Sequence, residues 1–406
     1  MTGKAGDDFL PYGRQTIHDD DIAAVAEVLR GDRLTTGPAV ERFETALASR
    51  VGARHAVACS SGTAALHLAA LTLDLAPGDR VVVPSLTFLA TANAPHHAGA
   101  DIVFADVDPD SGLMGAADLK AALDRAGQDG GAKVRAVFPV HLNGQCRDMA
   151  EIAELCAERG LAVVHDAAHA LGSHFIAGNE DHPVGWGGDG SMSAFSFHPV
   201  KTIAMGEGGA VTTDDDATAD RLRLARNHGM SRDAGGFVNT ALAFDDDGNP
   251  NPWYYEMAAP GFNYRASDIH CALAASQLDK LDSFVARRRA LAALYDEGLA
   301  GMAPVVTTVG RVAGCTPAWH LYVVLIDFAA AGVSRAEVMR RLGARGIGAM
   351  VHYMPVHLQP YYAARYGTLS LPGAERYYAR ALSLPLYPAM ADSDVERVLG
   401  ALRDSL

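Results

Sequence analysis

The pattern of apolar and polar positions along this chain predicts helices and strands that alternate in sequence. Short apolar runs recur about every thirty residues from Ala56 onward, and they are brief and apolar enough to be strands buried on both faces. These predicted strands span residues 81–84, 102–106, 134–140 and 161–166. Most of the intervening segments are helical in pattern. The alternation predicts an α/β fold with a mostly parallel sheet covered by helices on both faces.

Three further helices are predicted on either side of this region. Residues 19–29 form an amphipathic segment whose acidic first turn complements the positive end of a helix dipole, and residues 38–53 form another. A longer helix is predicted after Ser267, because apolar residues continue at helical spacing as far as Leu281. We expect this helix to lead into a smaller C-terminal α+β domain. The predicted units are an N-terminal segment with the large domain, residues 1–281, and the small domain, residues 282–406.

Two polar features of the chain resemble metal sites only superficially. The segment 230–251 is dense in Gly, Asp, Asn and Pro, which predicts an exposed loop. Its acidic triplet, Asp245–Asp247, lacks the alternation and the closing glutamate of a calcium loop. His352 and His357 are separated by Pro355, which prevents a helical pair of ligands. The sequence predicts no metal site.

Composition narrows the class of protein. The net charge of −14 over 406 residues argues against nucleic acid and anionic membranes as partners, although a few local arginines and helix N-termini would suffice for a nucleotide diphosphate. Five scattered cysteines without CxxC spacing are typical of reduced thiols in a cytosolic protein. Residues 1–8 have no apolar stretch of the kind found in a secretory signal, and no apolar run approaches 18 residues. We expect a cytoplasmic location and no membrane span.

One lysine stands out as a candidate for chemistry. Lys201 follows an apolar and aromatic run and precedes a Gly-Glu-Gly-Gly turn, and no Asp, Glu, Lys or Arg lies within five positions of it. Desolvation lowers the pKa of a lysine, and a neutral amine can condense with an aldehyde. A surface lysine between a strand and a turn is the alternative for this segment taken alone.

A second candidate ends the predicted strand 161–166. A carboxylate at the C-terminal end of such a strand, here Asp166, points into the ligand crevice of an open α/β sheet. Pyridoxal phosphate requires a carboxylate of this kind, because it keeps the pyridine nitrogen protonated and the ring able to accept electrons. An aspartate that caps the next helix is the competing interpretation, and the combination with Lys201 favours the cofactor.

An anion site and a stacking residue complete the predicted constellation. Ser61, Gly62 and Thr63 lie between a predicted strand and a helix start, where backbone N–H groups and hydroxyls can hold a phosphate. The same residues would also make an ordinary helix cap. Phe88, just after another strand, could stack on a pyridine ring, and a core phenylalanine is the equal alternative.

Taken in order, these segments resemble the DegT/DnrJ/EryC1/StrS family of sugar aminotransferases, whose architecture is the fold-type I (aspartate aminotransferase-like) fold. The resemblance runs from about Tyr12 to the C-terminus. The motifs that carry it are SSGTAAL, PSLTFLATANA, HDAAHALG, FSFHPVK followed by GEGG, and FNYRASDIHCALAASQLDKLD. Further segments around Pro11, Leu34, Pro252 and Val351 are similar to the branch of the family that acts in pseudaminic acid biosynthesis.

The resemblance implies a role for each matching residue. Lys201 matches the lysine that condenses with the aldehyde of pyridoxal phosphate, and Asp166 matches the partner of the pyridine nitrogen. Asn263 matches an asparagine that relatives supply from the neighbouring subunit, which implies a homodimer with a shared active site. The remaining cofactor contacts implied are Ser61, Gly62, Thr63, Phe88, His169 and Ser196, and the implied substrate contacts are Tyr12, Thr35, Thr36, Gly37, His352 and Tyr353.

The same resemblance implies the reaction. An amino donor, L-glutamate, gives its amino group to the C4 ketone of a UDP-linked 4-keto-6-deoxy sugar by a ping-pong sequence. Other nucleotide-linked keto-sugars, aminated at C3 or C4, remain open. A sugar dehydratase of the family would carry histidine in place of Lys201, and a non-catalytic regulatory protein would not need the intact Lys201 and Asp166 pair.

Overall fold

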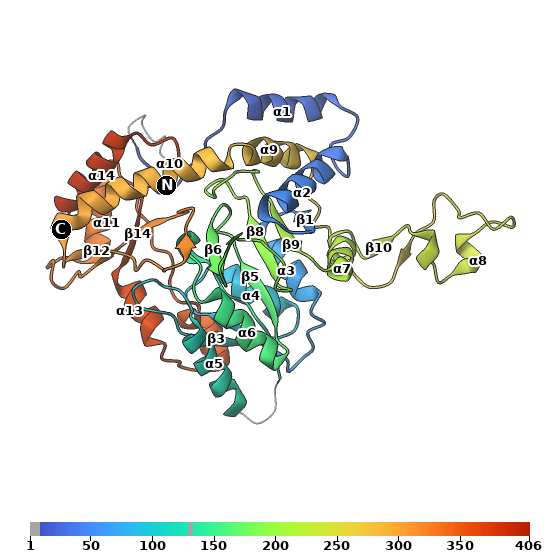
Figure 1. Ribbon diagram of the computed structural model, residues 1–406, viewed down its shortest axis with the longest axis horizontal. Coiled ribbons are helices and arrows are strands. Elements are labelled where there is room, and N and C mark those ends of the chain that lie inside the picture. Colours follow the sequence, from blue (N-terminus) through green and yellow to red (C-terminus); the bar gives the residue numbers. More distant parts are fainter. Residues whose placement is uncertain (1–8, 129–132) are drawn as a thin grey trace.

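The computed structural model describes residues 9–128 and 133–406, so residues 1–8, where no signal segment is predicted, lie outside the described part. A seven-stranded sheet forms the centre of the molecule (Figure 1). Its strands are, in spatial order, β1 (His55–Cys59), β9 (Gly209–Thr213), β8 (Met192–Ser196), β5 (Ala162–Asp166), β4 (Val134–Val137), β2 (Arg80–Pro84) and β3 (Asp101–Ala105). Only β9 runs antiparallel to its neighbours. The predicted α/β fold with a mostly parallel sheet is confirmed.

The four strands predicted from apolar runs are present, with ends that differ by up to three residues. The largest difference is at β4, which ends at Val137 rather than Val140. Pro139 lacks an N–H group and cannot continue the ladder. Most interior positions of these strands are buried because helices cover the sheet on both faces. The helices that follow or precede these strands are α3 (Gly62–Leu71), α4 (Leu89–His97), α5 (Ala116–Gln128), α6 (Met149–Arg159) and α7 (Asp216–Arg226).

Three helices at the edge of the large domain are tied together by buried carboxylates. They are α1 (Asp19–Arg30), α2 (Pro38–Val51) and α9 (Asp268–Leu278), and the first two were predicted within two residues. Asp268, at the start of α9 and 1% exposed, accepts hydrogen bonds from the N–H groups of Gly37 (2.8 Å) and Ala39 (2.9 Å). A carboxylate from one helix thereby caps the N-terminus of another, and this contact fixes the turn of residues 35–37.

The prediction of one long helix after Ser267 is wrong, because the structure has two helices there. The first, α9, ends at Leu278, and α10 (Leu281–Leu299) begins after a break at Asp279 and Lys280. The Lys280 N–H donates to Gln277 O (3.1 Å) instead of the Ser276 carbonyl that a continuous helix would use. The Lys280 ammonium donates a hydrogen bond to the Ser276 carbonyl (3.1 Å) and forms an ion pair with Asp21 (2.7 Å). The side chain thus compensates for the backbone hydrogen bond lost at the break.

The C-terminal part of the chain forms a smaller α+β unit (Figure 1). Its antiparallel sheet contains β12 (Val306–Thr308), β14 (Tyr322–Ile326) and β15 (Ala381–Leu384), and its helices are α10, α11 (Arg335–Ala344), α12 (Pro360–Tyr366), α13 (Pro372–Arg380) and α14 (Asp392–Arg403). The boundary at residue 282 stays a prediction. Near the N-terminus, Leu10 hydrogen-bonds to Gly346 and Gly348, and Tyr12 O accepts from the Leu386 N–H (3.1 Å), so this segment lies against the small domain.

Short elements complete the fold. They are β6 (His174–Ala177), β7 (Glu180–Pro183), β13 (Cys315–Thr316), and the 3₁₀ turns η1 (Leu142–Gly144), η3 (Ala300–Met302) and η4 (Val356–Leu358). Strand β6 pairs with both β7 and β13, so a small sheet joins the large domain to the segment before β14. This sheet brings residues far apart in sequence next to each other beside the central sheet.

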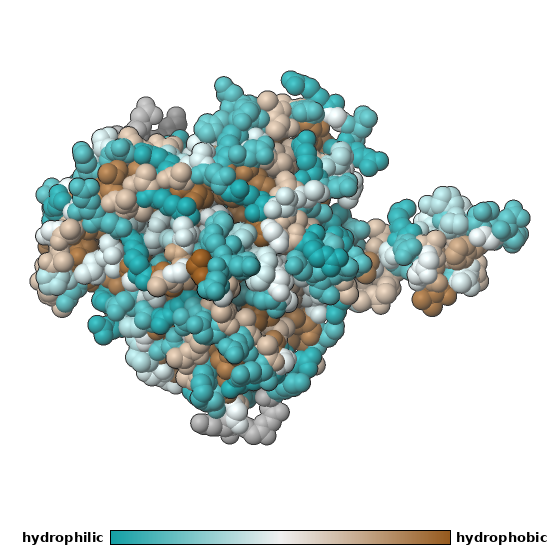
Figure 2. Space-filling model, in the orientation of Figure 1, coloured by the Kyte–Doolittle hydropathy of each residue, from teal (hydrophilic) through white to brown (hydrophobic). Residues whose placement is uncertain are grey.

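The polar segment 230–251, predicted as an exposed loop, belongs to an arm that projects from the body of the molecule (Figure 1). The arm comprises residues 230–257. Strands β10 (Met230–Ser231) and β11 (Glu256–Met257) pair at its base, and it also contains η2 (Ala234–Gly236) and α8 (Thr240–Ala243). In place of a metal site, Asp245 Oδ1 accepts from the N–H groups of Asp247 (3.0 Å) and Asn249 (2.8 Å) to close a turn. Apolar side chains nevertheless remain on the surface of the arm (Figure 2); they include Val238, Leu242, Trp253, Tyr255 and Met257.

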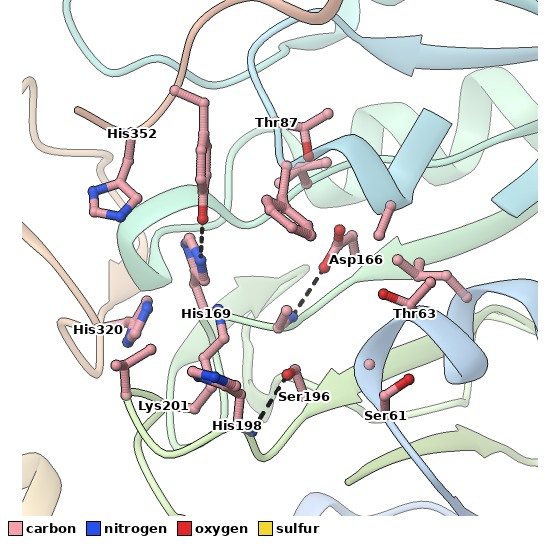
Figure 3. A pocket seen from close by; sticks show the side chains of 18 of the residues that line it. Ser61, Thr63, Thr87, Asp166, His169, Ser196, His198, Lys201, His320 and His352 are labelled. Carbon is pink, nitrogen blue, oxygen red and sulfur yellow. Dashed lines mark hydrogen bonds between the residues drawn. The ribbon is translucent and has the colours of Figure 1, made fainter. Parts of the chain in front are cut away.

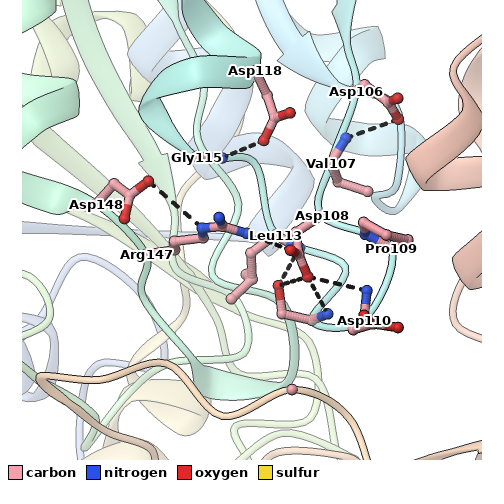
Figure 4. Close-up of polar contacts among 12 residues, drawn as sticks. Asp106, Val107, Asp108, Pro109, Asp110, Leu113, Gly115, Asp118, Arg147 and Asp148 are labelled. Carbon is pink, nitrogen blue, oxygen red and sulfur yellow. Dashed lines mark hydrogen bonds and ion pairs between the residues drawn. The ribbon is translucent and has the colours of Figure 1, made fainter.

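The acidic turn after β3 has a structural role. Asp108 Oδ1 accepts from the N–H groups of Asp110 (3.0 Å) and Ser111 (2.7 Å), and Asp108 Oδ2 pairs with Arg147 (3.1 Å) (Figure 4). Asp106 accepts from the N–H groups at the start of α13, at Gly373 (2.9 Å) and Ala374 (2.8 Å). Asp108 thus stabilises the turn within the large domain, and Asp106 joins the large domain to the small one.

Composition predicted free cysteines and no membrane-spanning helix. All five cysteines are free thiols; Cys315 is partly exposed and the other four are buried. Within residues 9–128 and 133–406, no helix has both the length and the apolar character that crossing a membrane would need.

The cap that Asp268 provides generates a prediction about stability. In an Asp268→Ala variant, the two N–H groups at the start of α2 lose their acceptor, so we expect the free energy of unfolding to fall by about 1–3 kcal/mol. Denaturant unfolding measures this change. Asp32→Ala, at an exposed position of the preceding loop, is the matched control and should change stability little. Equal stability of the two variants would contradict the capping role.

Candidate active site

A cavity of about 430 Å³ lies at the carboxyl ends of β5 and β8, against the N-terminus of α3 (Figure 3). Its lining comes from the large domain, from the N-terminal segment through Tyr12, and from the small domain through residues 350–353. This edge of an open parallel sheet is where ligands bind in α/β proteins. The structure brings together in one cavity eleven of the predicted residues: Tyr12, Ser61, Gly62, Thr63, Phe88, Asp166, His169, Ser196, Lys201, His352 and Tyr353.

Lys201 enters the cavity from the turn that follows β8. The turn is fixed by main-chain hydrogen bonds from Lys201 N–H to His198 O (2.8 Å) and from Met205 N–H to Phe197 O (2.8 Å). The ammonium is buried, and burial lowers the pKa of Lys201 to about 8, although the Asp166 carboxylate opposes the shift. A substantial fraction of this amine is therefore neutral near physiological pH.

Asp166 ends β5 and is held in place by two donors. Its Oδ2 accepts from the Thr91 hydroxyl (2.6 Å), and its Oδ1 accepts from the Ala168 N–H (3.1 Å). Thr91 in turn lies 2.7 Å from the Thr87 hydroxyl, which fixes its rotamer. Burial raises the pKa of Asp166 despite these hydrogen bonds and the nearby Lys201. A buried carboxylate in this situation favours a cationic partner in the cavity.

The N-terminus of α3 and the end of β8 form a cradle for an anion. Ser61 Oγ caps the helix by accepting from the Ala64 N–H (3.1 Å). The N–H groups of Gly62 and Thr63 have no acceptor among the residues that the structure describes, so they are available to a ligand. A Cβ at Gly62 would lie 2.6 Å from Ser196 Cβ, so only glycine leaves room between the helix and the strand.

The opposite end of the cavity carries histidines and a tyrosine (Figure 3). The Asn143 N–H donates to His169 Nδ1 (3.4 Å), which leaves the proton on Nε2, 3.1 Å from the Tyr353 hydroxyl. Burial and the nearby Lys201 hold the pKa of His169 well below its usual range, and burial lowers that of His352 to about 3. Both rings are neutral, so they can donate or accept hydrogen bonds without adding charge to the cavity.

Phe88 precedes α4 and faces the mouth of the cavity. Its ring is 55% exposed and lies 5.9 Å from the Tyr353 ring, measured between centroids. An exposed aromatic ring at the entrance of a cavity is not a core phenylalanine, so the structural alternative for this residue is excluded. Stacking on a cofactor ring stays a prediction.

Four of the predicted residues do not line this cavity in the same chain. Thr35, Thr36 and Gly37 form the turn before α2, and Asn263 pairs with Asn227 at the base of the arm. The role of Asn263 in a neighbouring subunit and the substrate contacts at residues 35–37 stay predictions.

Sequence reasoning missed two residues that shape the site. Thr91 holds Asp166, and its position four residues after Thr87 on a helix start was the available signal. His320 lines the cavity with its ring 4.3 Å from that of His169, and no motif in the sequence marks it. Its Nδ1 is buried and has no hydrogen-bond partner among the described residues.

A group of three ligand-type side chains lies outside the cavity. His18, Asp20 and Asp21 come within 4.8 Å of one another at the start of α1. The Lys280 ammonium pairs with Asp20 (2.8 Å) and Asp21 (2.7 Å). This cluster therefore already has a cation from the chain itself.

Comparisons with known proteins agree with this geometry. The DegT/DnrJ/EryC1/StrS aminotransferase family matches residues 15–403. The spore coat polysaccharide biosynthesis protein SpsC of Bacillus subtilis (strain 168) is 40% identical over 399 residues, which cover 98% of this chain and 97% of SpsC.

Two solved structures show the same fold. Helicobacter pylori PseC, an aminotransferase in the biosynthesis of pseudaminic acid, is 27% identical with a TM-score of 0.84, over 98% of this chain and 99% of PseC. DesV of S. venezuelae, solved in complex with a ketimine intermediate, is 34% identical with a TM-score of 0.81, over 97% of this chain and 98% of DesV.

Pyridoxal phosphate, the cofactor of that family, fits the residues present. The unpaired N–H groups at the start of α3 and the space kept by Gly62 suit its phosphate, and the buried Asp166 suits a protonated pyridine nitrogen. Lys201 offers the amine for the aldehyde. Each requirement of the cofactor is thus met by a separate element of the fold.

The lowered pKa of Lys201 generates a prediction about pH. The neutral amine attacks the cofactor aldehyde, so the rate at which the apo-protein takes up pyridoxal phosphate should rise with pH and level off above about 8. Visible absorbance after mixing measures this rate. Since Asp166 raises the pKa of Lys201, Asp166→Asn should move the midpoint to lower pH. A rate that keeps rising toward the ordinary lysine value of 10.5 would contradict burial of the amine.

The cradle at Gly62 generates a second prediction. The methyl group of Gly62→Ala would fall 2.9 Å from Ser196 Oγ, so we expect cofactor affinity to drop about tenfold or more, because overpacking costs about 1–3 kcal/mol. Equilibrium binding of pyridoxal phosphate measures this loss. Gly343→Ala, on an exposed position of α11 where a Cβ meets nothing within 4 Å, is the control and should bind normally.

Proposed function

This chain belongs to the DegT/DnrJ/EryC1/StrS aminotransferase family and is a pyridoxal-phosphate-dependent sugar aminotransferase, and we propose that its substrate is a UDP-linked 4-keto-6-deoxy sugar. The proposed substrate is UDP-4-keto-6-deoxy-L-AltNAc, aminated at C4 with L-glutamate as donor. The observation that carries the proposal is the buried Lys201 amine facing the Asp166 carboxylate in one cavity. In amino transfer with this cofactor, the amine bonds to the cofactor aldehyde and the carboxylate pairs with its ring nitrogen.

Residues from four parts of the fold are proposed to contact the cofactor. Ser61, Gly62, Thr63 and Ser196 would hold its phosphate, Asp166 its ring nitrogen, and Phe88 one face of its ring. When bound, the cofactor supplies an electron sink for the carbon that loses its proton. Thr91 keeps the Asp166 carboxylate in the orientation that this requires.

Lys201 would move the proton in each half of the reaction. Once released from the cofactor, its amine takes the α-proton of the amino donor and returns a proton at C4 of the sugar. A pKa of about 8 suits both directions, because the group can be deprotonated or protonated near neutral pH. The neutral His169, hydrogen-bonded to Tyr353, would orient the reacting groups without competing as a charge.

The choice of sugar is supported by the likeness to PseC and by the segments around Tyr12, Thr35, Trp253 and His352 that are similar to its branch. Tyr12, His352 and Tyr353 would contact the sugar from the N-terminal segment and the small domain. SpsC, named for spore coat polysaccharide biosynthesis, points more broadly to a sugar of a surface polysaccharide. Amination of another nucleotide-linked keto-sugar, at C3 or C4, is the second candidate.

A homodimer with a shared active site is proposed for two reasons. Among the described residues, the cavity lining within one chain contains no arginine, whereas a UDP-sugar carries a diphosphate that needs cationic groups or free N–H groups. The arm exposes apolar side chains, among them Trp253, which is 70% exposed, and such a surface suits burial against a second copy. Asn263 at the base of the arm, and the turn of residues 35–37, would then complete the cavity of the partner.

Individual features of the chain bear on two alternative functions and on its cellular location. Lys201 is incompatible with a dehydratase of the family, which carries histidine at that position. The intact pair of Lys201 and Asp166 disfavours a non-catalytic regulatory protein. The free thiols at all five cysteines favour the proposed cytoplasmic location.

The substrate can be tested by isotope transfer. With ¹⁵N-labelled L-glutamate and UDP-4-keto-6-deoxy-L-AltNAc, the holoenzyme should place ¹⁵N on C4 of the sugar, detected by NMR and mass spectrometry. Lys201→Ala should abolish transfer, because no other amine in the cavity lining can move the proton. Transfer to a different keto-sugar, with none to this one, would reject the proposed substrate and keep the sugar aminotransferase.

The shared site can be tested by mixing two inactive variants. Lys201→Ala and Asn263→Ala should each be inactive or strongly impaired alone. After unfolding and refolding together, half of the dimers combine both variants, and each of these has one intact site, so about one quarter of wild-type activity should return. If Asn263 acted within its own chain, each mixed dimer would carry its two lesions in separate sites, and the mixture would show no activity above the sum of the two variants.

A further inference from the structure

Two of the five cysteines meet behind the candidate active site. Cys315 lies on β13, which pairs with β6, and Cys146 follows the 3₁₀ turn η1. The Cys146 N–H donates to Cys315 Sγ at 3.2 Å. These residues are 169 positions apart in sequence, so the fold itself brings them together.

The two thiols differ in character. Hydrogen bonds from the Cys146 thiol and N–H, with the Arg289 guanidinium nearby, lower the pKa of Cys315, whereas burial raises the pKa of Cys146 well above its usual range. Arg289 is held beside β13 by hydrogen bonds to the carbonyls of Pro317 (2.8 Å) and Thr316 (3.2 Å). Cys315 therefore has the environment of a nucleophilic thiolate, and Cys146 that of a protonated neighbour.

Cys315 is also the accessible member of the pair. It lines a surface cavity of about 220 Å³ together with Arg289, Arg311 and Trp319. The Arg311 guanidinium stacks 4.1 Å from the Trp319 ring, so both guanidinium groups are fixed at the rim of this cavity. The other four cysteines are at most 2% exposed. A small oxidant can reach Cys315 before it reaches any other thiol of the described residues.

We propose that Cys315 is a peroxide-reactive thiol and that Cys146 resolves its oxidised form as an intramolecular disulfide. The Cys315 thiolate attacks one oxygen of hydrogen peroxide, the O–O bond breaks, and the second oxygen leaves as water after taking a proton, which leaves a sulfenic acid on Cys315. Cys146 then attacks that sulfur, the S–O bond breaks, and a second water leaves. Two thiols are oxidised, and one peroxide is reduced to two waters.

The disulfide would join two segments that already support the active site. Residues 143–146 hold His169 through the Asn143 N–H, and residues 315–320 carry His320 into the cavity. The segments are joined directly by the His320 N–H to Asn143 O (3.2 Å), and through Ser173, whose hydroxyl donates to Gly144 O (2.7 Å) and accepts from the Ala318 N–H (2.9 Å). The pair thus requires no large movement to approach, and its oxidation is a modification within a preformed contact.

The test uses the wild-type holoenzyme and one equivalent of hydrogen peroxide. After alkylation of the remaining thiols and digestion without reductant, mass spectrometry should find the Cys146 and Cys315 peptides joined, two hydrogens lighter than the free thiols. Dithiothreitol should reverse this change. Two alkylatable thiols per chain should be lost, and Cys59, Cys156 and Cys271 should remain free.

Single variants separate the two roles. Cys146→Ser should leave Cys315 as a sulfenic acid that dimedone traps, whereas Cys315→Ser should lose no thiol under the same treatment. Cys156→Ser, at a buried position on α6, is the matched control and should form the disulfide as the wild type does. Visible absorbance of the bound cofactor shows that each variant is folded.

The proposal is overturned if peroxide leaves both wild-type peptides alkylated, because that result needs no variant to interpret. It is equally overturned if Cys59, Cys156 or Cys271 is oxidised first, or if dimedone fails to label the folded Cys146→Ser protein.

Discussion

The site depends on a pair of opposite charges that line one cavity. Asp166 ends strand β5, Lys201 lies in the turn that follows the adjacent parallel strand β8, and both line the same cavity. Each is costly to bury without a partner, because desolvation disfavours both charged forms. The pair therefore suits a ligand that bonds covalently to the amine and places a cationic group beside the carboxylate. Pyridoxal phosphate can do both, through its aldehyde and its protonated ring nitrogen.

The rest of the fold holds this pair in position. Thr91 and Ala168 fix the carboxylate, and the main-chain hydrogen bonds of residues 197–205 fix the lysine. The N-terminal segment and the small domain close the cavity through Tyr12, His352 and Tyr353. Their contacts with the large domain rest on carboxylates such as Asp106, which caps α13 across the interface. Closure of the cavity is thus built from several independent polar contacts.

The large-domain sheet was predicted correctly, and the two residues predicted as a pair, Lys201 and Asp166, line one cavity. Both predictions follow from local patterns. A buried strand ending in aspartate, and a lysine without charged neighbours, are visible in a few consecutive residues. Features that depend on distant contacts could not be predicted. The break between α9 and α10 rests on the Lys280 side chain reaching Ser276 and Asp21, and His320 enters the cavity only because η1 and β13 meet. The arm was predicted as exposed, but its paired base and its projection from the body were not.

The residues of this cavity are proposed to pass an amino group from a donor to a UDP-linked keto-sugar. The most direct measurement is the visible absorbance of the purified holoenzyme while the two substrates are added one after the other. L-glutamate alone should bleach the band of the lysine-bound cofactor, and UDP-4-keto-6-deoxy-L-AltNAc should then restore it in equal amount. A band that bleaches and never returns with any nucleotide-linked keto-sugar would contradict the account, as would a protein in which neither substrate changes the spectrum.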